Sequence, residues 1–183
     1  PEVSVELQIT NRLVDLIEEG FDLALRTAVL EDSSLIARRL IDSQWIICAT
    51  PAYLKQHGTP QTPEQLQNHE CLVYKFDNTA NSTWPLYTDG KEQLISVHGR
   101  FHSNHLSAIK QAALSDLGIA FLPQVLIYEE IQQNTLTQIL QCFTSKKLGL
   151  YAVYPKARQP DQKLKLLVAH LRESLHQKQA YYY

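Results

Sequence analysis

The 183-residue sequence has no apolar run that approaches the roughly 18 residues of a membrane-spanning helix. Its charges nearly balance, with 17 Lys and Arg against 19 Asp and Glu and a formal net charge of −2. No strong field therefore draws the chain to nucleic acid or to an anionic membrane. The three cysteines, Cys48, Cys71 and Cys142, are odd in number and scattered. They argue against a disulfide framework and indicate free thiols in the reducing cytoplasm, as small buried hydrophobes rather than as a redox-sensing pair.

The sequence also has no motif on which an enzyme hypothesis can rest. The six glycines form neither a G-x-G-x-x-G nor a phosphate-binding loop, and no G-x-S-x-G elbow or paired-carboxylate motif is present. His98, His102 and His105 have a spacing that could suggest a metal site, but Arg100 shares the face of the first two and no carboxylate or thiol is close in sequence. We therefore predict no catalytic residue, no metal and no cofactor.

Residues 103–123 form the most informative stretch, which reads as a helix followed by a buried strand. Ser103 or Asn104 can cap the helix, and Gly118 stands where a left-handed residue would end it. Residues 119–122 are a short apolar run, typical of a strand buried on both faces. The helix N-terminus could point into a cleft and hold an anion there, or the stretch could be an ordinary α/β connection without a ligand.

The N-terminal part predicts a second group of site residues. Apolar and polar residues alternate over residues 3–9, which predicts a strand, and a helix is expected from Thr10 or Asn11 to residue 19, followed by a strand over 21–26. Such a βαβ unit makes its two strands parallel, so their carboxyl ends would bring Thr10, Asn11, Arg26 and Thr27 to one binding edge. In the alternative, Arg26 pairs with the local acid Asp22 and Thr10 is only a cap.

The remaining segments predict an alternation of strands and helices. A strand is expected over 40–49, a helix from Thr50-Pro51 to Gly58, a strand over 72–76 and a hairpin with its turn at Asp89-Gly90. A helix over 124–133, a strand over 148–154 and a last helix after Pro160 complete the chain, and the Arg38–Arg39 pair is interpreted as a solvated face. The alternation at both ends brackets the middle, which predicts two α/β lobes with crossings near 42–46 and 146–150.

Four phrases of the sequence resemble the effector-binding domain of bacterial LysR-type transcriptional regulators. They are ALSDLGIAFLP, LVDLIEEGFDLALRTAVLEDSSLIARRL, ICATPAYLKQHGTPQTPEQLQNHECL and GLYAVYP, and they occur in the order and spacing of that family. The departures are Ala28, where relatives often have Gly, and Asp116, where they often have a small residue. The resemblance implies a two-lobed α/β fold like that of type 2 periplasmic binding proteins, with mixed sheets flanked by helices. It assigns residues 1–45 and 150–183 to lobe I and residues 46–149 to lobe II.

The resemblance also implies a function and its partners. A small effector with a carboxylate would lie between the lobes, contacted by Thr10, Asn11, Arg26 and Thr27 from one side and by Ser103 and Asn104 from the other. Two domains would pair through the helices at 11–19 and 104–117, the full-length protein would be a tetramer, and DNA would be bound only by a winged helix-turn-helix upstream of Pro1. The alternative is a secreted solute-binding protein of a transporter, with the same fold.

One consequence concerns the sheet of lobe I. In the family this lobe begins with a strand and a helix that would precede Pro1, and that strand lies inside the sheet. Without it, the apolar faces of the neighbouring strands would be open to water, at a free-energy cost of roughly 25 cal/mol for each Å² of apolar surface. We expect residues before Pro1, rather than another chain, to fill this place.

Overall fold

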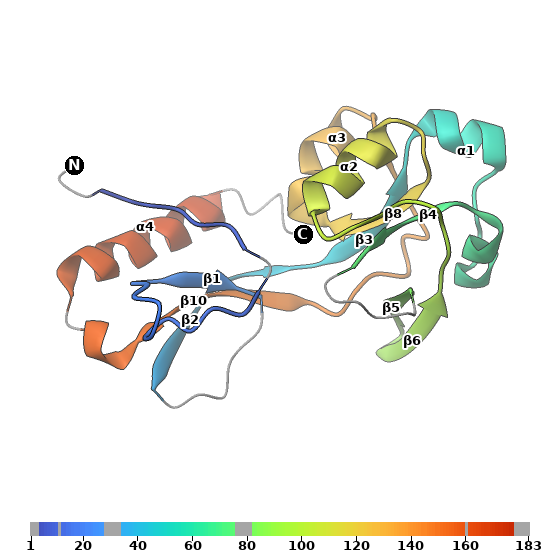
Figure 1. The fold of residues 1–183 in the computed structure, drawn as a ribbon. Helices are drawn as coiled ribbons and strands as arrows, with labels where there is room; N and C mark the ends of the chain where they lie inside the picture. Colours follow the sequence, from blue (N-terminus) through green and yellow to red (C-terminus); the bar gives the residue numbers. More distant parts are fainter. Residues whose placement is uncertain (1–3, 11, 28–33, 76–81, 160, 178–183) are drawn as a thin grey trace. The chain divides into compact units, whose positions relative to one another are not determined.

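The structure is a computed structural model that describes residues 4–10, 12–27, 34–75, 82–159 and 161–177. The chain forms two compact units: unit 1 comprises Pro1–Ser43 and Leu148–Tyr182, and unit 2 comprises Gln44–Lys147. The chain therefore leaves unit 1 once and returns to it once, as the colours of Figure 1 show.

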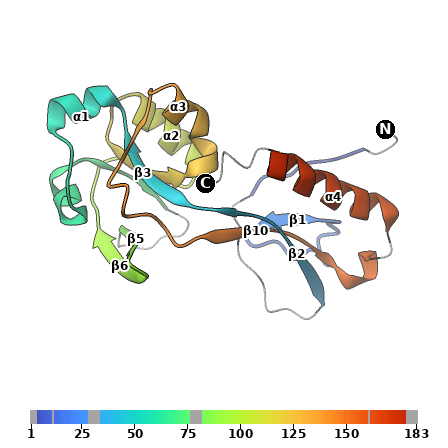
Figure 2. The same ribbon diagram turned by 180° about the vertical axis from the view of Figure 1, so that it is seen from behind.

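Unit 1 contains a three-stranded antiparallel sheet with one long helix along its side (Figures 1 and 2). The strand order is β1-β10-β2, and the strands are β1 (Ala24–Arg26), β10 (Leu148–Pro155) and β2 (Leu35–Ser43). The short 3-10 helix η3 (Lys156–Arg158) leads from β10 to helix α4 (Gln162–Gln177). The Asp161 carboxylate accepts hydrogen bonds from the backbone N–H groups of Lys163 (2.8 Å) and Leu164 (3.3 Å), so it stabilises the first turn of α4.

The strand predicted over residues 3–9 is wrong for the residues that the structure describes. Residues 4–10 have no regular secondary structure and are exposed. The apolar side chains of Val5, Leu7 and Ile9 are 65%, 76% and 83% exposed. Alternation makes a strand only where a neighbouring strand supplies hydrogen-bond partners, and no strand of the described chain pairs with this segment.

The predicted βαβ unit is therefore also wrong. β1 pairs antiparallel with β10, a strand from the other end of the chain. Of the helix predicted over 11–19, the described residues form only a single turn at residues 16–20. The Asp15 carboxylate stabilises the start of this turn, because it accepts from the N–H groups of Ile17 (2.9 Å) and Glu18 (3.0 Å). Gly20 ends this turn with φ +73°.

Unit 2 is built on a five-stranded mixed sheet of order β7-β4-β8-β3-β9. Its strands are β3 (Trp45–Ala49), β4 (Cys71–Tyr74), β7 (His102–Ser103), β8 (Ile119–Pro123) and β9 (Thr137–Ile139). β4 runs parallel to β7 and β8, whereas β3 is antiparallel to β8 and β9. A separate hairpin consists of β5 (Thr83–Thr88) and β6 (Lys91–Ser96), with the predicted turn at Asp89 and Gly90, which both have positive φ.

Both faces of this sheet are covered, as the apolar run at 119–122 predicted. One core cluster contains Ile119 and Phe121, and the other contains Ala120 and Leu122. Figure 1 shows α2 (Leu106–Leu114) and α3 (Tyr128–Gln132) on one face, with the β5–β6 hairpin on the other. Two 3-10 helices, η1 (Pro63–Asn68) and η2 (Gln124–Leu126), complete the unit. Because its strands are buried on both sides, unit 2 holds most of the buried apolar residues of the described chain.

Helix α1 (Pro51–His57) confirms its predicted start and end. The Thr50 hydroxyl accepts from the N–H group of Tyr53 at 3.2 Å, Pro51 is the first helical residue, and Gly58 has φ +86°. The end of α2 differs from its prediction. The left-handed residue is Asp116, with φ +60°, and its carboxylate accepts a hydrogen bond from the Thr50 hydroxyl.

Gly118 is required for a different reason than the one the sequence suggested. A Cβ atom at this position would lie 2.4 Å from the carbonyl oxygen of Glu70. A close approach of two backbone segments, rather than a left-handed turn, therefore requires glycine there.

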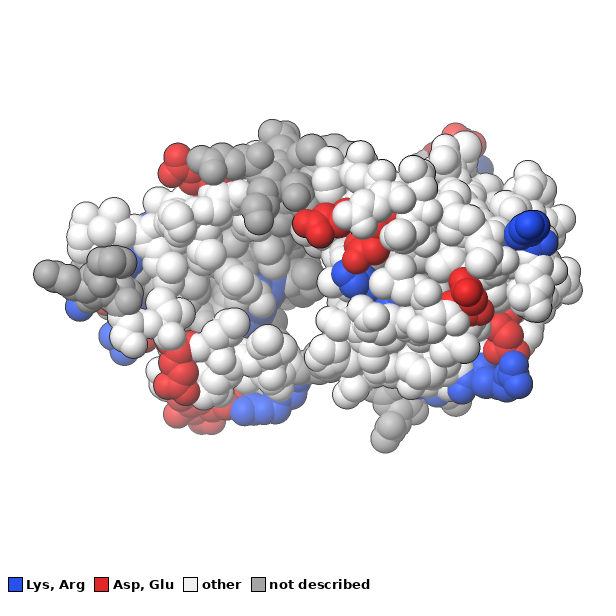
Figure 3. All heavy atoms as spheres, turned by 90° about the horizontal axis from the view of Figure 1, so that it is seen from above, with Lys and Arg blue, Asp and Glu red and all other residues white. Residues whose placement is uncertain are grey.

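The described surface carries charge of both signs. Figure 3 shows one face of the surface, most of which is formed by uncharged residues. Acidic and basic side chains are interspersed on it, in keeping with the net charge of −2. No helix in the described ranges has the length and apolar character needed to cross a membrane.

Candidate functional site

Arg26 is the charged member of the predicted site in unit 1, and β1 positions it. It is half-buried at the last position of that strand, and its Nη2 atom donates a hydrogen bond to the carbonyl oxygen of Val14. Asp22, the acid that the alternative assigned to Arg26, is instead 3.0 Å from Arg158. The guanidinium is therefore held against the 12–20 segment by a neutral acceptor, and within the described ranges it forms no ion pair.

The other residues predicted for unit 1 are less organised. Thr27 follows β1 directly and is exposed. Thr10 is exposed as well, and its hydroxyl accepts from the N–H group of Arg12 at 3.3 Å, which is the capping role that the alternative gave it. Asn11 and Ala28 lie outside the described residues. The structure thus links Arg26 to the segment that follows Thr10, although not through the predicted parallel strands.

In unit 2 the predicted residues lie at the start of α2. Ser103 is the half-buried last residue of β7, and Asn104 is exposed between β7 and the helix. The N-cap position is occupied by His105, without a side-chain cap bond, so neither Ser103 nor Asn104 is the predicted N-cap. The Ser103 hydroxyl instead accepts from the N–H group of His105 at 3.0 Å. This bond turns the chain from the strand into the helix.

The parallel pairing of β4 and β7 adds a residue that the sequence did not single out. Tyr74, the last residue of β4, is in register with Ser103, and the N–H group of Lys75 donates to the Ser103 carbonyl at 2.9 Å. The carboxyl ends of these strands form one edge, where ligands of open α/β sheets bind. Tyr74 is half-buried, and burial raises the pKa of its phenol, so the hydroxyl stays protonated as a donor. The strand predicted over 72–76 extended past Tyr74, so only the structure placed this residue at the end of the strand.

The cysteines do not form part of a reactive site within the described chain. Cys48 and Cys71 are buried, and burial raises the pKa of each thiol to about 12. A thiol with such a pKa carries almost no thiolate near neutral pH. Cys142 is exposed, so the prediction of a buried thiol is wrong for this residue, and all three cysteines are free.

A metal centre is not indicated in the part of the chain that the structure describes. No three side chains of the His, Cys, Asp and Glu types come together there in an arrangement that could hold an ion. His98, His102 and His105 thus do not form a metal site in these ranges.

Two mixed α/β units joined by two chain crossings define a class of ligand-binding fold shared by regulators and transport proteins, and comparison with known proteins separates these possibilities. The LysR substrate binding domain family matches residues 1–176, and the chain belongs to that family. Its fold is the periplasmic-binding-protein-like fold of LysR regulatory domains.

The relatives are transcriptional regulators. An uncharacterised HTH-type transcriptional regulator of Haemophilus influenzae is 34% identical over 86% of this chain and 54% of its own length. The regulatory domain of CrgA from Neisseria meningitidis is 33% identical over 87% of this chain and 78% of that chain, with a TM-score of 0.77. The full-length Vibrio cholerae virulence activator AphB is 28% identical over 95% of this chain and 59% of that chain, with a TM-score of 0.80.

The chain spans about half the length of the curated relatives that it matches. The family and these relatives are regulators and not enzymes. The alternative of a transporter's solute-binding protein is therefore set aside, since the matches name regulators of transcription.

Proposed function

We propose that this chain is the effector-sensing part of a cytoplasmic, DNA-binding LysR-type transcription factor. The observation that carries the proposal is the family match over residues 1–176, together with relatives that are named as transcriptional regulators. DNA would be bound by an N-terminal winged helix-turn-helix outside this sequence, and the full-length protein would be a tetramer.

In this proposal the two compact units are lobes I and II, and a small molecule with a carboxylate binds to residues of both. Arg26 supplies the positive charge, and Thr10, Asn11 and Thr27 supply hydrogen-bonding groups from unit 1. Ser103, Asn104 and the free N–H groups at the start of α2 contribute from unit 2, with Tyr74 beside them. A half-buried guanidinium on a neutral acceptor and a helix N-terminus both favour an anion.

The role of Arg26 is tested by an Arg26→Ala variant. A thermal-shift screen of mono- and dicarboxylates identifies a ligand, and calorimetry then measures its affinity for both proteins. We expect at least a tenfold loss of affinity, because a charge-assisted hydrogen bond contributes about 1.5–3 kcal/mol. Circular dichroism should show an unchanged fold.

Arg12→Ala is the matched control, because Arg12 is exposed in the same unit and paired with Glu19. The Arg12→Ala variant should bind the identified carboxylate with the same affinity as the unmodified chain. Unchanged affinity in the Arg26 variant would remove Arg26 from the site. A screen in which no carboxylate stabilises the chain would contradict the proposed ligand class.

We further propose that two chains associate through the 12–20 segment of one and the α2 region, 104–117, of the other. The predicted helix at 11–19 is not formed, so the first surface is the turn that carries Leu13 and Ile17, which are 68% and 58% exposed. Leu117, 52% exposed just after α2, belongs to the second surface. Leu13 and Ile17 lie four residues apart in one exposed segment, and neighbouring exposed apolar side chains, unlike a single one, favour an interaction surface.

Sedimentation analysis tests this association. The unmodified chain should sediment as a dimer, and Ile17→Lys or Leu117→Lys should weaken the dimer at least tenfold, because a buried charge without a partner is costly. Leu94→Lys is the matched control, since Leu94 is 67% exposed on the β5–β6 hairpin of unit 2. A monomer at high concentration, or equal effects of all three variants, would contradict the proposed surfaces.

A further inference from the structure

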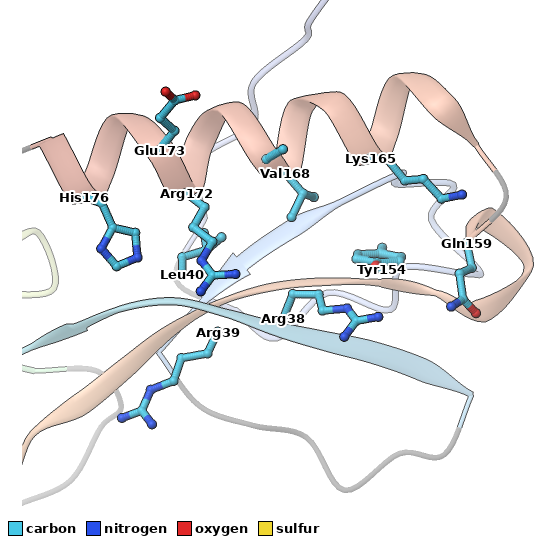
Figure 4. A pocket seen from close by; sticks show the side chains of 11 residues that line it. Arg38, Arg39, Leu40, Tyr154, Gln159, Lys165, Val168, Arg172, Glu173 and His176 are labelled. Atoms are coloured by element: carbon cyan, nitrogen blue, oxygen red, sulfur yellow. The ribbon is translucent and has the colours of Figure 1, made fainter.

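A groove of about 580 Å³ lies within unit 1, between helix α4 and the strands β2 and β10 (Figure 4). Its floor contains the buried residues Leu40 and Tyr154, which are 2% and 7% exposed. Val168 and Ala169 of α4 add further apolar surface. A groove of this volume with an apolar floor is within the size range of small-molecule sites.

The rim of the groove is basic, with cationic side chains from both α4 and β2. Lys165 and Arg172 are seven residues apart on α4, and His176 follows after four more, so the three lie along one side of the helix. On β2, Arg38 and Leu40 both border the groove, and Leu40 is the extra residue of a β-bulge between Arg39 and Ile41. Figure 4 shows the Arg172 side chain pointing from α4 toward the sheet, with the Arg38 side chain close to the strand.

Acidic side chains do not neutralise this rim. Among the described residues, no ion pair involves Arg38, Lys165 or Arg172. Glu173 also borders the groove, but Figure 4 shows its carboxylate on the side of α4 that faces away from the sheet. Arg39 also borders the groove, but Figure 4 shows its side chain extending from the opposite face of β2, where its Nε atom is 2.8 Å from the Asp42 carboxylate. Adjacent arginines of one strand thus have different environments.

We propose that this groove is a second ligand site, which binds a small organic acid: one carboxylate on an apolar body. The carboxylate would interact with Arg38 and Arg172, and the apolar body would cover Leu40, Tyr154 and Val168. Guanidinium groups that form no ion pair within the described ranges, beside an apolar floor, favour this combination over an inorganic anion, because only an amphipathic acid uses both surfaces. None of the residues that line the groove belongs to the set proposed around Arg26 and the start of α2, so the two sites share no residue.

The test compares 1-naphthoate with the neutral 1-naphthalenemethanol by calorimetry on the 183-residue chain. The acid should bind saturably, and the alcohol should bind at least tenfold more weakly because it lacks the charge. Arg38→Gln and Arg172→Gln should each weaken naphthoate binding about tenfold. Arg39→Gln is the matched control, since it removes the same charge from the neighbouring residue on the other face, and it should change the affinity less than twofold.

Arg26→Ala separates this site from the proposed effector site, and it should leave naphthoate binding unchanged. The inference is overturned if naphthoate does not bind, if the alcohol binds equally well, or if Arg39→Gln weakens binding as much as Arg38→Gln. It is also overturned if Arg26→Ala abolishes binding while Arg38→Gln does not, which would place the acid at the effector site instead.

Discussion

Replacing Gly99 with alanine should lower the free energy of unfolding by about 3 kcal/mol or more. A Cβ atom on this residue would lie 1.9 Å from the carbonyl oxygen of Cys71 and 2.9 Å from its backbone nitrogen. Both of these are backbone atoms, which cannot rotate away as a side chain could. The methyl group therefore forces two segments of the unit-2 core apart.

The surroundings of Gly99 leave little room for such a movement. The N–H group of Cys71 donates to the carbonyl of His98 at 2.9 Å, directly before the glycine. On the other side of the same segment, the N–H group of Ile119 donates to the Glu70 carbonyl at 2.8 Å, and Gly118 approaches that carbonyl closely. The start of β4 is thus enclosed on two sides by backbone, and glycine stands at each point of contact, Gly99 on one side and Gly118 on the other.

Gly90→Ala is the matched control for the Gly99 variant. Gly90 has φ +75° in the hairpin turn, and open space surrounds the position of its missing Cβ atom. Alanine there should cost only about 1 kcal/mol, from the left-handed backbone. Urea unfolding of both variants measures the difference, and a Gly99 variant within 1 kcal/mol of the unmodified chain would contradict the predicted close contact.

Lys110→Met should destabilise the chain by about 2–3 kcal/mol near neutral pH. The Lys110 Nζ atom of α2 is 2.6 Å from the Glu130 carboxylate of α3 and 3.2 Å from the carbonyl of Leu126. Both charged side chains are largely buried, at 19% and 18% exposure. Removal of the lysine leaves a carboxylate with little access to water and without its cation, and this unpaired charge is the main cost.

A double variant separates that cost from the value of the pair itself. Lys110→Met combined with Glu130→Leu should recover most of the lost stability, because an apolar pair leaves no unpaired charge behind. Arg100→Met is the control, since the Arg100–Glu70 pair is 90% and 38% exposed and should be worth less than about 1 kcal/mol. Equal losses for Lys110→Met and Arg100→Met in urea unfolding would contradict the argument from burial.

Features that depend on neighbours in the chain were predictable. The Thr50-Pro51 start and Gly58 end of α1, the Asp89-Gly90 hairpin turn and the doubly buried strand at 119–122 all occur where they were expected. Each follows from local backbone chemistry or from an unbroken apolar run. The family was also recognisable from four phrases of the sequence, and it is confirmed by the match over residues 1–176.

The sequence by itself determined the family, the class of fold and the elements whose hydrogen bonds close within a few residues. Tertiary structure alone decided what residues 4–10 do, because a strand needs a partner that its own pattern cannot supply. It decided that Gly118 serves a backbone contact and that Asp116 makes the left-handed turn. It also decided that the Arg39 side chain extends away from α4 and pairs with Asp42, although Arg38 and Arg39 both border the groove, since the two faces of a strand differ only in what packs against them.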